Sequence, residues 1–397
     1  MKKFFLATLG FFLAAVIFFT FKTLQFYQKI YTPKKEIPKE KTQYNILLFG
    51  YGGGKHEGAY LTDTIMLFHL DLASKSATLI SIPRDLWVKL PTKDNSDFHT
   101  KINAVYQMEL FPENYPLLDK RFLGDKKDAN LIKYIVGGIF GVKIDNYIAV
   151  DFEGFKKAID LLGGVEVNVE KSFTDPQYPI EGKEKDLCDQ QTEELFKKAE
   201  VFLKPGYNPE DRDRVFSEDP KVEEFVKNAT ASPHLAFPCR YETITFTKGK
   251  TLMNGETALK YVRSRHSNQD GNDFSRARRQ HLLLMAVKDK VLSLGFIAKA
   301  PLLLNQLGEH IKTDLSISDI KKLSQESLKA NQYYLTTFVI STDNFLKEGY
   351  SSEGGYILYP KEGIDQWEHF QKEFKLILKG ATPTPPSPQK SQPSPSP

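Results

Sequence analysis

Short apolar runs in the first part of the chain recur at the spacing of β-strands. Residues 45–49 form a compact apolar run, and residues 64–70 and 78–82 are β-rich runs joined by a turn at 71–74. These runs predict a buried strand followed by a hairpin. Gly50, Gly52, Gly53 and Gly54 follow the first run. They predict either a loop that approaches a ligand closely or an ordinary turn at a strand end.

Helical spacing dominates later parts of the chain. Residues 130–140 and 152–162 place apolar side chains at helical intervals, and residues 147–150 and 165–169 have the pattern of strands. A strand, a helix and a strand in so short a stretch predict a compact α/β unit. Further helices are expected to begin at 101–106 and to occupy 254–263, 277–294, 296–307, 318–328 and 365–378, with strands at 333–340 and 356–359.

The beginning of the chain has the composition of a membrane anchor. Residues 4–21 are an uncharged run of 18 residues rich in Phe and Leu, which is near the short end of the length that spans a bilayer as a helix. No small-x-small cleavage site follows, so we predict an uncleaved transmembrane helix within residues 1–22. Lysines lie on both sides of the run, so their count leaves the orientation open.

A spacer and a tail flank the expected folded body. Residues 32–41 are rich in Pro, Lys and Glu, so residues 23–43 are predicted to be a spacer. Residues 381–397 consist mostly of Pro, Ser, Thr and Gln, and a segment of this composition is expected to be disordered. The body is therefore expected to occupy residues 44–380.

The hydrophobic pattern breaks up between about residues 170 and 250. Seven prolines and many acidic residues occur there, which predicts an irregular insertion or surface loop. Cys188 and Cys239, the only cysteines of the chain, both lie in this stretch. They suit a disulfide if the compartment is oxidising, and two unrelated thiols fit the sequence about as well.

Positive charge gathers in residues 260–281. This stretch holds six Lys or Arg against Asp270 and Asp273, a formal charge of +4, which equals the +4 of the whole chain. Arginines around a loop suit bidentate hydrogen bonding to phosphate. Arg84 is a further candidate, because Pro83 ends the hairpin and α/β folds often place ligand groups at strand exits. The ligand is therefore expected to be anionic.

Several separated stretches match the motifs of one family: NILLFG, LTDTIMLFHLD, ATLISIPRDLWV, KINAVY, IDNYIAVDFEGFKKAIDLLGGVEVNV, MNGETALKYVRSRH and DFSRARRQ. Together they resemble the LytR-CpsA-Psr family of membrane-anchored cell-wall enzymes. The resemblance implies an α/β fold with a mixed central β-sheet sandwiched by helices, held outside a bacterial membrane by one N-terminal span. It also implies transfer of a glycopolymer, such as a teichoic acid or capsular chain, from an undecaprenyl pyrophosphate carrier to peptidoglycan.

The resemblance assigns roles by position. Asp63 is expected to bind Mg²⁺, Lys101 to lie near the substrate, and Asp273 to be the acid of the arginine stretch. Pyrophosphate contacts are expected from Arg84, Arg263, Arg265, Arg276 and Gln280. Phosphoryl transfer requires positioning and neutralisation of phosphate oxygens, which suits arginines with one divalent cation. Magnesium prefers a few carboxylates, completed by water and phosphate oxygens.

One position departs from the family pattern. The family has an aspartate as second metal ligand where this chain has Gly52, and the nearest acid in that loop is Glu57. Three interpretations remain open: Glu57 supplies the missing carboxylate, Asp63 and substrate phosphates hold the metal alone, or the metal is weakly bound. A solvated loop acid is an equally good interpretation of Glu57.

The remaining arginines of the basic stretch differ in their expected roles. Arg279 is a candidate substrate contact, whereas Arg278 is expected to be solvated because it is offset from the face shared by Arg276 and Gln280. Nucleic-acid binding is disfavoured, because the chain has no helix-turn-helix pattern, a modest pI of about 8.6 and an expected membrane anchor. Two rivals keep the phosphate site: a non-catalytic binder of polyprenyl phosphates or cell-wall polymer, and a polyprenyl pyrophosphatase that uses water as acceptor.

Overall fold

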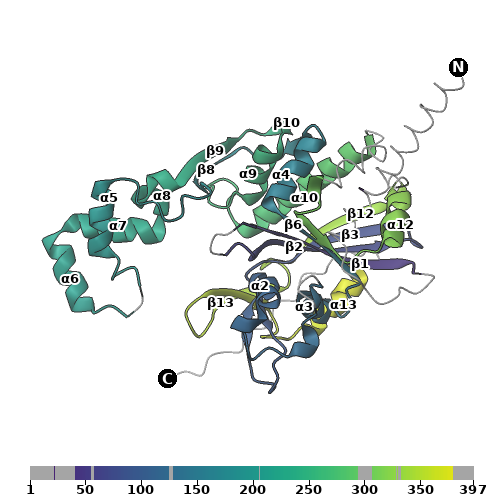
Figure 1. The fold of residues 1–397 in the computed structure, drawn as a ribbon, viewed down its shortest axis with the longest axis horizontal. Coiled ribbons are helices and arrows are strands. Elements are labelled where there is room, and N and C mark those ends of the chain that lie inside the picture. The colour runs from purple at the N-terminus through teal and green to yellow at the C-terminus, as the bar shows by residue number, and fades with distance from the viewer. Residues whose placement is uncertain are drawn as a thin grey trace, which may run out of the picture. The chain divides into compact units, whose positions relative to one another are not determined.

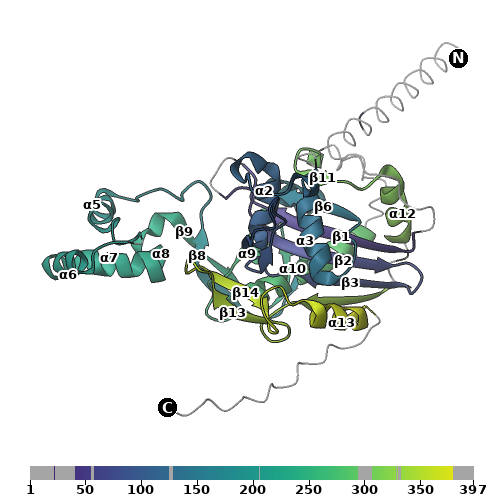
Figure 2. The same cartoon turned by 90° about the horizontal axis from the view of Figure 1, so that it is seen from below.

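The computed structural model describes residues 22, 41–54, 58–124, 128–204, 206–293, 306–327, 329 and 332–378. The chain forms two compact units, Met1–Gly164 with Val287–Pro397, and Val165–Ala286. We call the first the sheet unit and the second the arginine unit. Figures 1 and 2 show the elements of both as ribbons.

The sheet unit is built on a mixed six-stranded β-sheet with the strand order β11-β6-β1-β2-β3-β12. Its strands are β1 (Gln43–Tyr51), β2 (Thr62–Asp71), β3 (Ser76–Ser81), β6 (Asn146–Asp151), β11 (Ile311–Thr313) and β12 (Tyr334–Val339). β1 runs antiparallel to β2 and parallel to β6, whereas β3 runs antiparallel to β2 and parallel to β12. The predicted buried strand, the hairpin and the mixed central sheet are confirmed.

Helices cover both faces of this sheet, and Figure 1 shows α3 and α13 on the side opposite α4. The helices of the sheet unit are α2 (Val105–Leu110), α3 (Asn130–Phe140), α4 (Phe152–Leu161), α12 (Ile317–Ser327) and α13 (Glu368–Ile377). Tyr44 and Ile46 of β1 pack with Ile320 of α12, and Phe49 contacts Tyr106 of α2 with ring centroids 4.6 Å apart. A strand buried on both faces is apolar throughout, which explains the unbroken run in β1.

Two predictions about local structure in this part of the chain are corrected in part: the helix start at 101–106 and the partner of the strand at 165–169. Lys101 does not begin a helix: it ends β5 (His99–Lys101), which pairs with β4 (Trp87–Lys89), and α2 begins only after the 3₁₀ turn Ile102–Ala104. The strand predicted at 165–169 exists as β7 (Val165–Val169), but it pairs with β10 (Gly249–Met253) of the arginine unit. β6, α4 and β7 therefore do not share one sheet, because local spacing does not specify a strand's partner.

The arginine unit contains two antiparallel strand pairs and two helices that carry the basic stretch. β7 pairs with β10, and β8 (Phe173–Pro179) pairs with β9 (Tyr241–Phe246) through a bulge between Asp175 and Tyr178. Helix α9 (Gly255–Arg263) starts at the predicted cap, since Asn254 Oδ1 accepts a hydrogen bond of 2.8 Å from Thr257 N. Helix α10 (Asp273–Ser293) begins in this unit and ends in the sheet unit.

Residues between β8 and β9 form a helical lobe, so the expectation of an irregular insertion is corrected. Its elements are α5 (Gln190–Ala199), α6 (Pro209–Glu218), α7 (Pro220–Ala231), α8 (Pro233–Ala236) and the 3₁₀ turn Pro238–Arg240. A small core joins Val222 and Phe225 of α7 to Phe237. Proline is favoured at the first helical position. The prolines interpreted as breakers therefore mostly start helices.

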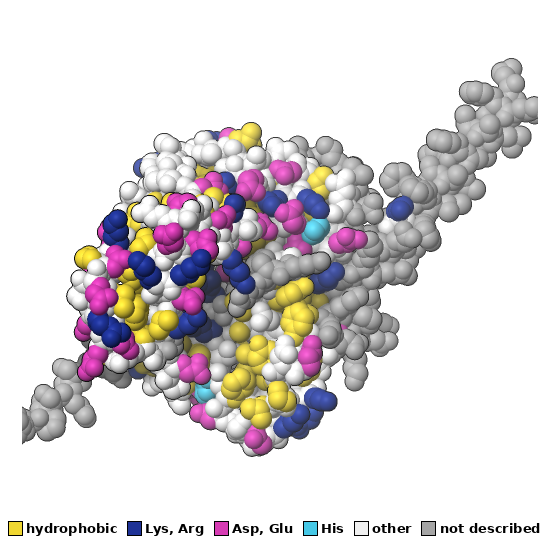
Figure 3. All heavy atoms as spheres, turned by 60° about the vertical axis from the view of Figure 1, so that its left-hand side comes forward, with side chains coloured by type: hydrophobic (Ala, Val, Ile, Leu, Met, Phe, Trp, Pro, Cys, Tyr) yellow, Lys and Arg dark blue, Asp and Glu magenta, His cyan; other side chains and the backbone are white. Residues whose placement is uncertain are grey.

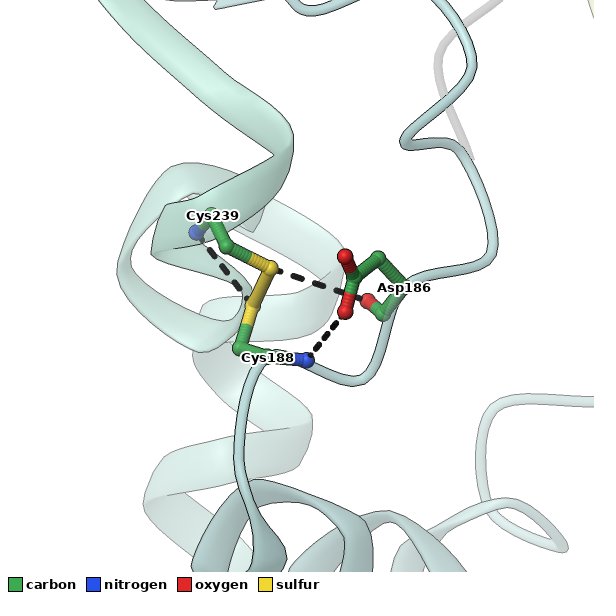
Figure 4. A group of neighbouring side chains, drawn as sticks. All are labelled: Asp186, Cys188 and Cys239. Carbon is green, nitrogen blue, oxygen red and sulfur yellow. Dashed lines mark hydrogen bonds between the residues drawn. A yellow bond between two sulfur atoms is a disulfide. The ribbon is translucent and has the colours of Figure 1, made fainter.

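Cys188 and Cys239 form a disulfide in this lobe, with Cα atoms 5.4 Å apart (Figure 4). Asp186 lies beside the bridge, and its carboxylate accepts a hydrogen bond of 2.9 Å from Cys188 N. Among the described residues, these three form the only group of three or more His, Cys, Asp or Glu with ligand atoms within 4.8 Å of one another. Because the sulfurs are bonded to each other, neither is a thiolate, and we do not assign a metal to this group.

Some expectations fall on other parts of the chain. The predicted anchor at residues 4–21, residues 23–40 of the spacer, the tail at 381–397 and most of the helix at 296–307 lie outside the described residues. The last residue of the predicted spacer, Gln43, begins β1. Within the part that is described, no helix has the length and apolar character needed to span a bilayer.

Candidate functional site

The candidate residues fall into two groups, one in each unit. In the sheet unit, Asp63 lies on β2 at a bulge, because Thr64 pairs with Gly50 and Thr62 pairs with Tyr51. A bulge leaves one residue unpaired and re-aims its side chain. Asp63 is that residue, so the ladder hydrogen bonds do not fix it as they fix its neighbours.

Arg84 lies where the sequence predicts it, in the turn after β3. Arg84 Nη1 forms an ion pair of 2.7 Å with Asp63 Oδ1, and its Nε lies 3.5 Å from Asp85 Oδ2. Lys101 Nζ lies 2.7 Å from Asp85 Oδ1, because the pairing of β4 with β5 places Lys101 opposite Trp87, close to Asp85 in sequence. The sheet unit thus brings Asp63, Arg84 and Lys101 into one network of alternating charge.

The glycine loop after β1 is shaped by close approach of the chain. Gly53 has φ +76°, and a Cβ there would lie 3.0 Å from the Cβ of Asp151. Gly53 N also donates a hydrogen bond of 2.7 Å to Ala59 O. The loop therefore returns on itself, but Glu57 lies outside the described residues, so its predicted role at the metal stays a prediction.

The donor set near Asp63 fits Mg²⁺ only in part. Asp63 is half-buried, and its carboxylate forms an ion pair with Arg84. Within the described residues, no group of three acids or histidines surrounds it. Magnesium is often bound through one or two carboxylates, with water and substrate phosphates as the other ligands. Asp63 suits this arrangement as a single carboxylate ligand, with water and substrate phosphates as the others.

The arginine unit holds the second group on two helices and the loop between them. We call residues 264–272 the arginine loop, since α9 ends at Arg263 and α10 begins at Asp273. Arg263 and Arg265 are half-buried, whereas Arg276 and Gln280 are buried one turn apart on α10. Gln280 Nε2 lies 3.4 Å from Val262 O, which connects α10 to the end of α9. The side chain of Asp273 lies outside the described part.

A buried carboxylate that sequence reasoning missed holds the arginine loop. Asp175 Oδ2 accepts hydrogen bonds from Ser264 Oγ at 2.7 Å, Arg265 N at 2.9 Å and His266 N at 3.1 Å. Burial alone raises the pKa of Asp175, but these bonds and one from Gln177 together outweigh it and lower the pKa below its ordinary value. Asp175 is therefore ionised at neutral pH.

Arg279 does not point its donors at a substrate. Its side chain is 2% exposed, and its guanidinium donates to the backbone carbonyls of Tyr261, Ser264 and Asp270 and to the Asp270 carboxylate. These bonds occupy all three nitrogens. The geometry therefore does not support the predicted substrate contact. A buried guanidinium needs hydrogen-bond acceptors, and here the protein's own oxygens supply them.

Tyr178 is a second residue that the sequence did not single out. It follows the bulge of β8 and is buried, and its hydroxyl accepts a hydrogen bond of 3.3 Å from Arg263 Nη1. Burial raises the pKa of this hydroxyl above its ordinary value, although Arg263 works in the opposite direction. Both Asp175 and Tyr178 thus support the basic stretch from one strand.

His281 is buried in α10, directly after Gln280, and burial lowers its pKa from 6.5 to about 4. The neutral form therefore stabilises the fold fully above pH 6.5, and this contribution is lost as the pH falls towards 4. We expect it to amount to about 3 kcal/mol of unfolding free energy. Urea unfolding of wild type and His281→Leu at pH 7 and 4.5 measures it.

In the His281→Leu variant, the part of the acid-induced loss of unfolding free energy that comes from His281 should be absent. The exposed His266 provides the matched control, because His266→Gln should retain the wild-type pH dependence. Equal pH dependence of the unfolding free energy in wild type and His281→Leu would contradict the assignment.

The two groups can stabilise anionic charge rather than supply a nucleophile. Arginines with fixed backbones neutralise phosphate oxygens, and one carboxylate suits a divalent cation. On the face drawn in Figure 3, Lys and Arg lie interspersed with Asp and Glu.

The chain is similar to known proteins in sequence. The sequence profile described as the LytR_cpsA_psr family matches residues 16–368. Polyisoprenyl-teichoic acid–peptidoglycan teichoic acid transferase TagV of Bacillus subtilis (strain 168) is 26% identical over 292 residues, which span 73% of this chain and 54% of TagV. The corresponding transferase TagU of Enterococcus faecalis is 22% identical over 343 residues, or 85% of this chain and 80% of TagU.

Solved structures share the fold. The crystal structure of B. subtilis TagV superposes with a TM-score of 0.52 at 23% identity, covering 86% of this chain and 98% of TagV's. A Streptococcus agalactiae protein superposes with a TM-score of 0.54 at 17% identity, covering 85% and 88%. The fold is thus the mixed α/β fold of these proteins. With the profile covering most of its length, this chain belongs to the LytR-CpsA-Psr family.

Proposed function

We propose that this protein is a phosphotransferase that moves a glycopolymer, teichoic-acid-like or capsule-like, from an undecaprenyl pyrophosphate carrier to peptidoglycan. Two relatives bear the names of polyisoprenyl-teichoic acid–peptidoglycan transferases. The observation that carries the proposal is the basic stretch at the end of α9, where Asp175 holds the backbone N–H of Arg265 and the Tyr178 hydroxyl accepts a hydrogen bond from Arg263. Two arginines so close in sequence suit the two phosphates of such a carrier.

The proposed reaction replaces the phosphoanhydride bond of the carrier's pyrophosphate with a phosphate ester bond to peptidoglycan. A hydroxyl oxygen of peptidoglycan attacks the phosphorus that bears the polymer, and the bond from that phosphorus to the bridging oxygen breaks. The polymer is then joined to peptidoglycan by a phosphodiester, and undecaprenyl monophosphate leaves with the bridging oxygen. The hydroxyl proton is released to the leaving phosphate or to solvent.

In this proposal, the arginines stabilise the charge that develops on phosphate oxygens. Arg84 serves from the sheet unit, and Arg263, Arg265, Arg276 and Gln280 serve from the arginine unit, with Lys101 and Asp273 in supporting roles. Preorganised donors of this kind are effective because they need not reorganise as the reaction proceeds. Asp63, with Glu57, would hold Mg²⁺, which would supply further neutralisation of the phosphates.

An assay with purified full-length protein tests the proposal. A polyprenyl-pyrophosphate-linked polymer is incubated with peptidoglycan, and release of polyprenyl monophosphate is measured with and without this acceptor. We expect release that requires the acceptor. Release that is independent of peptidoglycan would identify a pyrophosphatase instead, and protection of the donor without release would identify a binding protein.

We also propose that residues 1–22 anchor the chain and that the body lies outside the cell membrane. The Cys188–Cys239 disulfide supports this topology, because disulfides persist in oxidising compartments. A reporter fused after Gly380 is expected to be accessible to protease added to intact cells with the outer wall removed. A reporter that is protected until the membrane is dissolved would contradict the topology.

A further inference from the structure

The backbone of the arginine loop is held by opposite charges. At the start of the loop, the Asp175 carboxylate accepts hydrogen bonds from the backbone N–H groups of Arg265 and His266. The Arg279 guanidinium donates hydrogen bonds to two backbone carbonyls of the loop, that of Ser264 at the start and that of Asp270 near the end. Two backbone donors of the loop are thus paired with an acid, and two of its backbone carbonyls are paired with a base.

Asp175 is built into this position by its strand. It is 1% exposed on β8, and Gln177 N donates to its other oxygen, Oδ1, at 2.9 Å within the bulge. Three donors on one oxygen and one on the other leave little room for the carboxylate to rotate. Because the N–H groups of two consecutive residues bind the same oxygen, the chain direction at Arg265 is fixed.

The rest of the loop is packed so closely that it cannot shift freely. A Cβ at Gly271 would lie 2.1 Å from Ser267 O, so this position requires glycine. Asp270 N donates to Ser267 Oγ at 2.9 Å, and Asn272 Oδ1 accepts from Ser275 N at 2.7 Å, which caps α10. Hydrogen bonds within the loop and to the first turn of α10 thus support the backbone between α9 and α10.

We propose that Asp175 is a positioning residue, which sets the place of the Arg265 guanidinium by fixing the loop backbone against β8. This inference rests on the proposed function, because it assumes that Arg265 contacts phosphate. Arg279 completes the arrangement from the carbonyl side. Neither residue contacts the substrate, and each acts through the arginines of the stretch.

The expected effect follows from the geometry. In Asp175→Asn the side chain keeps its size but loses its charge, and its amide nitrogen faces a backbone or hydroxyl donor in either orientation. A displacement of about 1 Å in a positioning group costs about a hundredfold in rate. We expect Asp175→Asn to lower kcat by about tenfold to a hundredfold and to weaken binding of inorganic pyrophosphate.

A double-variant cycle separates positioning from general stability. Asp175→Asn, Arg265→Ala and the combination are compared for kcat at a temperature at which circular dichroism shows each to be folded. If Asp175 acts through Arg265, Asp175→Asn lowers kcat by less than about threefold once Arg265 is absent. Losses that multiply independently would overturn the inference.

Asp314 provides the matched control, because it is 2% exposed and accepts hydrogen bonds from Tyr147 N and Lys133 in the sheet unit. Both Asp314→Asn and Asp175→Asn should lower the melting temperature, but Asp314→Asn should retain the wild-type kcat. If Asp175→Asn does not fold, Ser264→Ala removes a single donor to the same oxygen, and its loss of kcat should likewise shrink in the Arg265→Ala background.

Inorganic pyrophosphate distinguishes failure of this inference from failure of the proposed function. Wild type that binds pyrophosphate and transfers polymer, with Asp175→Asn equal to it in both, would overturn the positioning role alone. Wild type that neither binds pyrophosphate nor transfers polymer would overturn the proposed function, and this inference with it.

Discussion

Replacement of Arg265 by alanine is expected to lower the rate of polymer transfer by about a hundredfold to a thousandfold while the protein stays folded. The rate falls because a charge-assisted donor to the phosphate is lost where charge develops. The fold is retained because Asp175 holds the backbone N–H of Arg265, which alanine keeps. Steady-state release of polyprenyl monophosphate, with circular dichroism of the same sample, measures both.

Arg278 gives the control for charge alone. Its side chain is 67% exposed and pairs with Glu170 at 2.6 Å, so Arg278→Ala removes the same charge from the same basic stretch without touching the loop. We expect transfer near the wild-type rate in Arg278→Ala. Wild-type transfer in Arg265→Ala, or equal losses in both variants, would contradict a specific role for Arg265.

Asp63→Asn is expected to raise the magnesium concentration needed for half-maximal transfer by at least about tenfold. The substitution keeps the size of the side chain and removes the charge that both Mg²⁺ and Arg84 require. A magnesium titration of transfer measures the change. Asp71 lies at the other end of β2 and gives the control, because Asp71→Asn should leave the magnesium dependence unchanged.

The same titration tests the second carboxylate. If Glu57 reaches the metal, Glu57→Gln should raise the required magnesium concentration less than Asp63→Asn does, and Gly52→Asp should lower it by restoring a carboxylate at the position typical of the family. An unchanged dependence in Glu57→Gln would leave Asp63 as the only protein carboxylate supported at the metal.

Regular elements were predictable from the sequence where their apolar spacing was strong. The helix predicted at 130–140 coincides with α3, and the hairpin of β2 and β3 has the predicted turn. The pairing of strands far apart in sequence was not predictable, as the pairing of β7 with β10 shows. The helical lobe was missed because proline disrupts helix interiors but favours first positions, and the sequence alone does not tell which applies.

The charged residues of the candidate site were predictable from the sequence, but the residues that hold them in place were not. Arg84 lies at the expected strand exit, and its ion pair with Asp63 joins two motifs of the family. Asp175 gave a weak signal, as a polar residue at an inward position of a strand that also buries Phe173. Its partners lie about ninety residues later, so no local pattern connects them.

The most direct test of the central claim follows a single phosphorus atom. A donor is prepared with a radioactive label on the phosphorus that bears the polymer, and the protein is incubated with it, with peptidoglycan and with magnesium. The account predicts that the label appears in peptidoglycan as a phosphodiester, together with an equal amount of unlabelled polyprenyl monophosphate. Label released as soluble phosphopolymer, or label that stays on the lipid, would contradict it.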